Sequence, residues 1–176
     1  VGTKFAGAYL GGHLFLASWH SDSSNGRLSV VDFSDPAAPI VLGRPSSERW
    51  GVLHPIGPSH LVGRFISGNP KFPDTHLRAL DVSVPTAPQT VSSLDFDGVR
   101  NPVVDGSLVY LVHGSHLRQS IKVLDYSDPS DPVEIAEALI PGGRAALGDG
   151  YLAVSRSSPG VVALVDISDP ENLTEL

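Results

Sequence analysis

Histidine is the residue type in this chain best suited to metal binding, because the sequence holds seven histidines and no cysteine. His113 and His116 lie three residues apart, and His20 is a third candidate ligand. A zinc or iron site needs three or four ligands that converge within a few ångströms. Sequence spacing does not show such convergence. We therefore predict no metal and no other cofactor, and we keep these three histidines as the candidate ligands.

Nucleophilic catalysis has little support in the sequence. Cysteine is absent, no Gly-x-Ser-x-Gly motif occurs, and Ser59 and Ser115 merely precede His60 and His116 in the chain. A catalytic triad is made by residues that meet in space, not by sequence neighbours. We therefore predict a protein without catalytic activity. The alternative is a hydrolase or a metal-dependent oxidoreductase.

Aspartate recurs at Asp32, Asp81, Asp125 and Asp166, which could suggest a carboxylate cage around a metal ion. Each of these residues is expected at the outer end of a strand, so side chains from different repeats would lie too far apart to share an ion. An aspartate before a turn commonly accepts hydrogen bonds from the backbone that follows it. We interpret the four aspartates as structural residues of four equivalent turns.

The aspartates belong to one twelve-residue phrase, which reads LSVVDFSDPAAP at 28–39, LRALDVSVPTAP at 77–88, IKVLDYSDPSDP at 121–132 and VALVDISDPENL at 162–173. Successive aspartates are 49, 44 and 41 residues apart, which is the period of a four-stranded propeller blade. The sequence therefore predicts an all-β fold, a β-propeller built of about four four-stranded antiparallel blades. The repeats fall at about 1–43, 44–94, 95–139 and 140–176.

Each repeat is interpreted as four short strands, A to D. Apolar residues occupy adjacent and alternate positions of strand C, as at Leu28, Val30 and Val31, which indicates a sheet covered on both faces. The proline of Ser-Asp-Pro ends that strand. The expected strands are 4–10, 14–19, 28–33 and 40–43, then 50–56, 61–66, 77–82 and 90–94, then 100–104, 108–112, 121–126 and 133–139, and finally 145–147, 151–155, 162–167 and 172–176.

The phrases VVDFSDP, VLDYSDP and LVDISDP resemble those of the LVIVD repeat family. The resemblance implies a β-propeller and, since the family occurs in exported or surface proteins of bacteria and archaea, an extracellular, cell-surface or periplasmic location. It implies no activity, because the family has no shared catalytic motif. Two copies depart from the pattern, with Val84 in place of aspartate and Leu173 in place of proline. We expect looser turns there and an unchanged fold.

Composition restricts the classes of partner. The net charge is −7 and the sequence pI is about 5.3, which argues against nucleic-acid binding because phosphate contacts require a basic surface. The apolar runs fall far short of the roughly 18 residues that a membrane span needs. We therefore predict one globular domain with no membrane span and no nucleic-acid partner.

The number of blades in the complete ring stays open. The four repeats form either a closed four-bladed ring or part of a larger ring. We favour the larger ring, because four-bladed rings lie at the small end of the propeller range and no cysteine is available to clamp one. Further sequence or a second chain would then complete it, and 172–176 would pair outside a single four-blade closure.

Basic residues gather at one expected end of the blades. Each D–A loop ends in an arginine, namely Arg49, Arg100 and Arg144, and this end also holds Arg156, His20, His113 and, deeper in the channel, His54. Local pairing with carboxylates would make these arginines structural; otherwise they would attract an anion. We predict a binding or scaffolding module that recognises a protein or an anionic ligand at this end. In the enzyme alternative, the same mouth holds the active site, and in a second alternative the chain is a structural subunit of a larger assembly.

Overall fold

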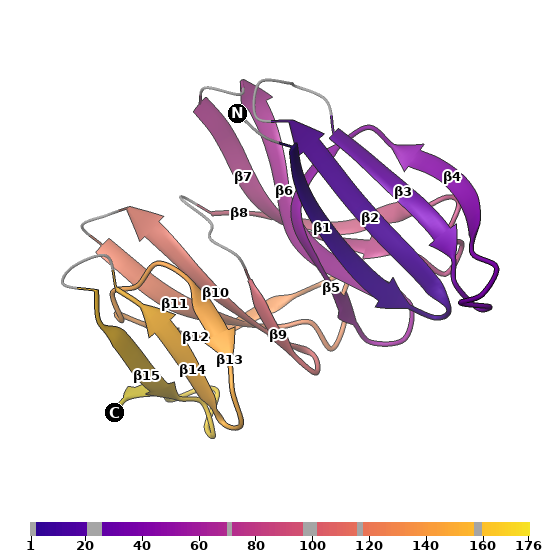
Figure 1. Ribbon diagram of the computed structural model, residues 1–176. Helices are drawn as coiled ribbons and strands as arrows, with labels where there is room; N and C mark the ends of the chain where they lie inside the picture. Colours follow the sequence, from indigo (N-terminus) through magenta and orange to yellow (C-terminus); the bar gives the residue numbers. More distant parts are fainter. Residues whose placement is uncertain (1–2, 21–25, 70–71, 97–101, 116–117, 157–159) are drawn as a thin grey trace. The chain divides into compact units, whose positions relative to one another are not determined.

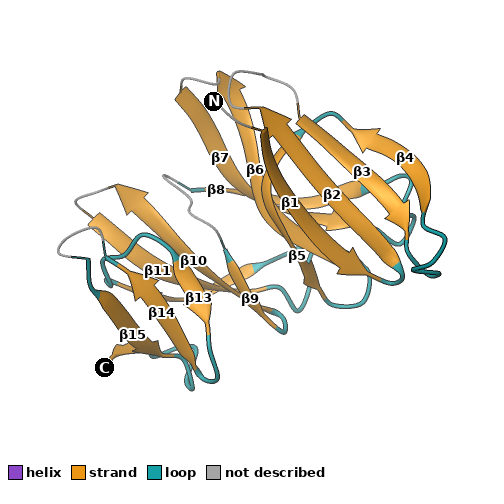
Figure 2. Ribbon diagram, viewed as in Figure 1, coloured by secondary structure: helices purple, strands orange, loops and turns teal. Residues whose placement is uncertain are grey.

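The computed structural model describes residues 3–20, 26–69, 72–96, 102–115, 118–156 and 160–176. β-Strands are the regular elements of these residues, and no helix occurs among them (Figures 1 and 2). The prediction of an all-β fold is confirmed.

Within the described ranges, sixteen strands form four antiparallel four-stranded sheets, and in each sheet the strands lie in chain order. Blade 1 consists of β1 (Thr3–Leu10), β2 (His13–His20), β3 (Gly26–Asp32) and β4 (Ile40–Ser46). Blade 2 consists of β5 (Arg49–Ile56), β6 (His60–Asn69), β7 (Phe72–Asp81) and β8 (Gln89–Asp95). Blade 3 consists of β9 (Val103–Asp105), β10 (Leu108–Ser115), β11 (Arg118–Asp125) and β12 (Val133–Ala138). Blade 4 consists of β13 (Ala145–Leu147), β14 (Tyr151–Ser155), β15 (Val162–Asp166) and β16 (Thr174–Glu175).

The chain divides into two compact units, one of residues 1–95 and one of residues 96–176. The first unit contains blades 1 and 2, and the second contains blades 3 and 4. The division falls one residue after the expected repeat boundary at 94.

The predicted order of strands is confirmed, and the largest difference lies in one hairpin. β6 and β7 pair from His60 opposite Asp81 out to Asn69 opposite Phe72, whereas the sequence suggested strands of only 61–66 and 77–82. The added residues are largely polar and include Pro73. They therefore lack the apolar alternation by which a strand is recognised in a sequence.

The two faces of each blade can be defined from the repeated aspartate. We call the face with the residues two and four positions before this aspartate the front face, and the opposite one the back face. In blade 1, Val30 and Leu28 thus lie on the front face, and Val31 and Ser29 lie on the back face.

In each unit a front face packs on a back face. In the first unit, Phe15, Leu28 and Val30 on the front of blade 1 meet Trp50, Leu61, Phe65 and Leu80 on the back of blade 2. In the second, Tyr110, Ile121 and Val123 on the front of blade 3 meet Leu152, Val154, Ala163 and Val165 on the back of blade 4. These side chains are at most 7% exposed, so both faces of a sheet take up apolar residues, as the strand C pattern predicts.

The repeated aspartates build four equivalent turns, which confirms their structural interpretation. The side-chain Oδ1 atoms of Asp32, Asp81, Asp125 and Asp166 accept hydrogen bonds of 2.8 to 2.9 Å from the backbone N–H of the serine two residues later. The residue directly after each aspartate donates its backbone N–H to a carbonyl of the A–B turn. In blade 2, for example, Val82 donates to Ser59 at 2.8 Å. The phrase therefore joins the end of strand C to the hairpin beside it.

These turns predict acid sensitivity. Hydrogen bonds from the serines lower the pKa of all four aspartates. A carboxyl group with a lowered pKa in the folded state stabilises the fold above its unfolded-state pKa of about 3.9, and this stabilisation is lost as the pH falls through the folded-state pKa. Replacing all four aspartates by asparagine should lower the melting temperature at neutral pH and weaken its dependence on pH below about pH 4. Thermal melts followed by circular dichroism would measure both effects. Asp149→Asn, in an A–B turn, is the control and should leave the dependence of the melting temperature on pH below about pH 4 unchanged.

Candidate functional site

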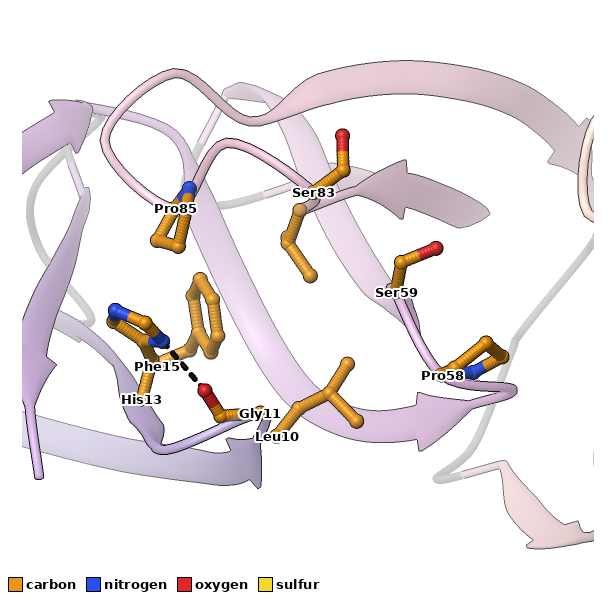
Figure 3. Close-up of a pocket in the computed structure, with 9 residues that line it drawn as sticks. Leu10, Gly11, His13, Phe15, Pro58, Ser59, Ser83 and Pro85 are labelled. Carbon is orange, nitrogen blue, oxygen red and sulfur yellow. Dashed lines mark hydrogen bonds between the residues drawn. The ribbon is translucent and has the colours of Figure 1, made fainter. Parts of the chain in front are cut away.

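A cavity of about 290 Å³ lies between the turns of blades 1 and 2 (Figure 3). Leu10, Phe15, Pro58, Val82 and Pro85 form the apolar part of its wall. They come from the A–B hairpins of both blades and from the C–D turn of blade 2. The cavity is therefore built at the end of the blades that carries the repeated aspartates, and not at the end with the arginines.

Polar groups complete the wall of this cavity. His13, Ser59 and Ser83 are among its lining residues. The Nδ1 atom of His13 lies 2.9 Å from the carbonyl oxygen of Gly11 (Figure 3). Since a carbonyl can only accept, this hydrogen bond places a proton on Nδ1.

The surroundings of the cavity are acidic. Ser83 donates its backbone N–H to Asp81, and the equivalent carboxylate of blade 1, Asp32, interacts electrostatically with His13. Hydrogen bonds to serine lower the pKa of both carboxyl groups, so both carry a negative charge at neutral pH. A space with a partly apolar wall and two nearby carboxylates suits an apolar group that is flanked by a cation.

Arg49, expected at an open rim, is only 3% exposed. Its Nη2 donates to the backbone carbonyls of Ser67 and Gly68 at 2.9 and 2.8 Å. The guanidinium group therefore joins the entry of β5 to the end of β6 in the same blade.

The other predicted arginines have different surroundings. Arg100 lies outside the described residues. Arg144 is exposed, and its backbone N–H donates to the Oγ of Ser155 at 3.0 Å. The Arg156 guanidinium donates to both carboxylate oxygens of Glu175 at 2.5 Å, so its charge is paired within blade 4. Arg49 and Arg144 belong to different units, and convergence of the arginines on one mouth stays a prediction.

The predicted histidines do not form a recognisable metal centre in the described part of the chain. His54 is partly buried on β5. His20 is the last residue of β2, and its side chain is not among those that the structure describes. His116 also lies outside the described residues. Among the described residues, no group of three or more histidine, cysteine, aspartate or glutamate side chains is arranged to hold a metal ion.

His113 belongs to a polar cluster in blade 3. Its Nε2 lies 2.8 Å from Ser120 Oγ and 3.1 Å from Glu137 Oε1. The hydrogen bonds from Ser120 and Lys122, aided by that of His113, lower the pKa of Glu137 to about 2. A carboxylate with so low a pKa is a poor proton acceptor at neutral pH, so this cluster supports the sheet better than it supports acid–base chemistry.

A serine, a histidine and an aspartate form a chain of hydrogen bonds in blade 2. Ser67 Oγ lies 2.7 Å from His76 Nε2, and His76 Nδ1 lies 2.5 Å from Asp95 Oδ1. The order of the three groups is that of a nucleophile, a base and an orienting carboxylate. Sequence analysis missed this arrangement because the residues come from β6, β7 and β8, and only the strand register brings them together.

Comparison with known proteins identifies one repeat. The sequence profile of the LVIVD repeat matches residues 11–45, which run from the A–B turn of blade 1 to near the end of β4. No curated protein matches the chain. The described residues contain no helix long and apolar enough to cross a membrane.

Proposed function

We propose that this chain, which carries the LVIVD repeat and folds into propeller blades, is a non-catalytic module that binds a protein partner. The observation that supports this proposal best is the cavity between blades 1 and 2, with its partly apolar wall and nearby carboxylates. The resemblance to exported repeat proteins supports an extracellular, cell-surface or periplasmic location as part of the same proposal.

The size and charge of the cavity favour a particular kind of partner. A volume of about 290 Å³ lies at the lower end of the range for small-molecule sites and suits one apolar side chain. The carboxylates of Asp32 and Asp81 favour basic neighbours in the partner. We therefore propose a surface segment in which a leucine or phenylalanine is flanked by lysine or arginine.

A peptide titration tests this proposal. The peptides Gly-Arg-Leu-Arg-Gly and Gly-Glu-Leu-Glu-Gly, each blocked at both ends, would be added to isotopically labelled protein and followed by amide chemical shifts. We expect millimolar binding of the basic peptide alone, with shifts at Gly11, Ser59 and Ser83. Ser59→Trp should fill the cavity mouth and abolish these shifts, whereas Thr90→Trp, on the exposed part of β8, should preserve them. Equal shifts with both peptides, or binding that survives Ser59→Trp, would contradict the proposal.

The arrangement of Ser67, His76 and Asp95 favours hydrolysis as the second candidate function. In such a reaction, Ser67 Oγ would attack an acyl carbon while His76 Nε2 takes the hydroxyl proton and then returns it to the leaving group. Asp95 would orient the imidazole, although its side chain is 83% exposed and a solvated carboxylate orients less firmly.

A fluorophosphonate label separates the two candidate functions. A hydrolase would be phosphonylated on Ser67, with loss of fluoride, and Ser67→Ala would remove the label. Ser120→Ala is the matched control because Ser120 also lies beside a histidine. The binding module that we propose should show no labelling of Ser67 at all.

A further inference from the structure

The back face of blade 1 is apolar and uncovered within its own unit. Phe5 and Tyr9 of β1 are 77% and 57% exposed, Leu16 of β2 is 40% exposed, and Val41 of β4 is 69% exposed. The strand register places all four on the back face. Monomeric proteins rarely expose large contiguous apolar patches, so four exposed apolar side chains on one face give it the character of an interface.

The front face of blade 4 has the same character. Tyr151, Val162 and Leu164 are 44%, 59% and 49% exposed, and Val162 and Leu164 pair with Ser155 and Ala153 of β14. None of these side chains carries a charge. The first and last blades therefore each present one uncovered apolar face, and the two faces are of opposite kinds.

The chain itself shows which kind of surface fits each face. The front of blade 1 packs on the back of blade 2, and the front of blade 3 packs on the back of blade 4. The exposed front of blade 4 thus lacks a back face, and the exposed back of blade 1 lacks a front face. The same packing rule makes these two surfaces complementary to each other.

We propose that a second copy of this chain covers both faces, with the front of blade 4 of each copy packed on the back of blade 1 of the other. Such a front-to-back contact is heterologous, and two identical contacts close two chains into a ring. Two copies of four blades give eight, which is within the size range of propellers. A closed ring of only four blades would lie at the small end of the propeller range, which favours a second copy over closure of one chain on itself.

Light scattering coupled to size-exclusion chromatography tests this pairing on the chain itself. We expect a particle of twice the 18.5 kDa chain mass. Phe5→Glu and Leu164→Glu should each weaken association by about 30-fold or more, because a carboxylate would be buried in the contact. Val84→Glu replaces a residue that is 56% exposed in the C–D turn of blade 2, and as the control it should leave the dimer intact.

Mixing the two variants gives the sharpest result. In a pair of one Phe5→Glu chain and one Leu164→Glu chain, one contact carries both substitutions and the other is native. The mixture should therefore form dimers at concentrations at which neither variant does so alone. Circular dichroism would establish that both variants are folded. A native chain that stays monomeric, variants that dimerise normally, or a mixture that fails to pair would each overturn the proposal, and none of these outcomes affects the cavity proposed for peptide binding.

Discussion

Replacing Trp50 by alanine should destabilise the first unit by about 3 to 5 kcal/mol, the cost of truncating a large aromatic side chain in a core. Trp50 is 1% exposed and belongs to the core between blades 1 and 2. Its ring centroid lies 5.5 Å from that of Phe65, so alanine would leave a cavity beside a second aromatic ring. Urea unfolding followed by circular dichroism would measure the loss.

Phenylalanine at position 50 provides the control. The indole Nε1 is buried and has no hydrogen-bond partner among the described residues, so phenylalanine would retain most of the packing and remove a donor that gains nothing from burial. Trp50→Phe should therefore cost much less than Trp50→Ala. Equal losses for the two variants would show that ring packing does not account for the stability.

The turns were predictable from sequence because their chemistry is local. Asp32 and its three equivalents bond to a serine only two residues away, so residue types within one short phrase determine the contact. The number of sheets and their strand order followed from recurrence of that phrase. The C–D turn forms even in blade 2, where Val84 replaces aspartate. The backbone carbonyl of Val84 still accepts the turn hydrogen bond from the N–H of Ala87.

The candidate sites were less accessible to sequence analysis because they depend on contacts between strands and blades. Leu10 and Pro85 line one cavity although 75 residues separate them in the chain. The 2.7 Å contact of Ser67 with His76 depends on a hairpin that extends beyond its apolar residues. Arg49 and Arg144 both end an expected D–A loop, yet Arg49 is buried and bonded to carbonyls whereas Arg144 is exposed. Position in a repeat therefore predicted the fold but not the environment of each side chain.

The back faces of blades 1 and 2 differ at one position, and this difference explains why blade 2 has a glycine there. Leu16 on the back of blade 1 corresponds to Gly63 on the back of blade 2, since each lies opposite the residue three positions before the repeated aspartate. A Cβ atom at Gly63 would lie 2.2 Å from the carbonyl oxygen of Val52 and 3.3 Å from Cε3 of Trp50. Glycine thus allows β5 and its tryptophan to lie close to β6, and this placement delivers Trp50 to the core.

Gly63→Ala should accordingly destabilise the first unit by about 1 to 3 kcal/mol or more, the usual cost of overpacking. The overlap is with a backbone oxygen, which cannot move away without disturbing the pairing of β5 with β6. Gly7→Ala is the matched control, because the closest atom to its new Cβ would be the Cδ2 of Leu16 at 3.2 Å, the end of a flexible and partly exposed side chain. The nearest backbone atom, the carbonyl oxygen of Phe15, would lie at an ordinary contact distance of 3.6 Å. Urea unfolding should give clearly different free energies of unfolding for the two variants. A Gly63→Ala protein as stable as Gly7→Ala would show that β5 can shift without loss of stability.

The two substitutions Gly63→Ala and Trp50→Ala should not be additive. Together they should lower the free energy of unfolding by less than the sum of the two single changes, because removing the indole lets β5 relax away from the new methyl group.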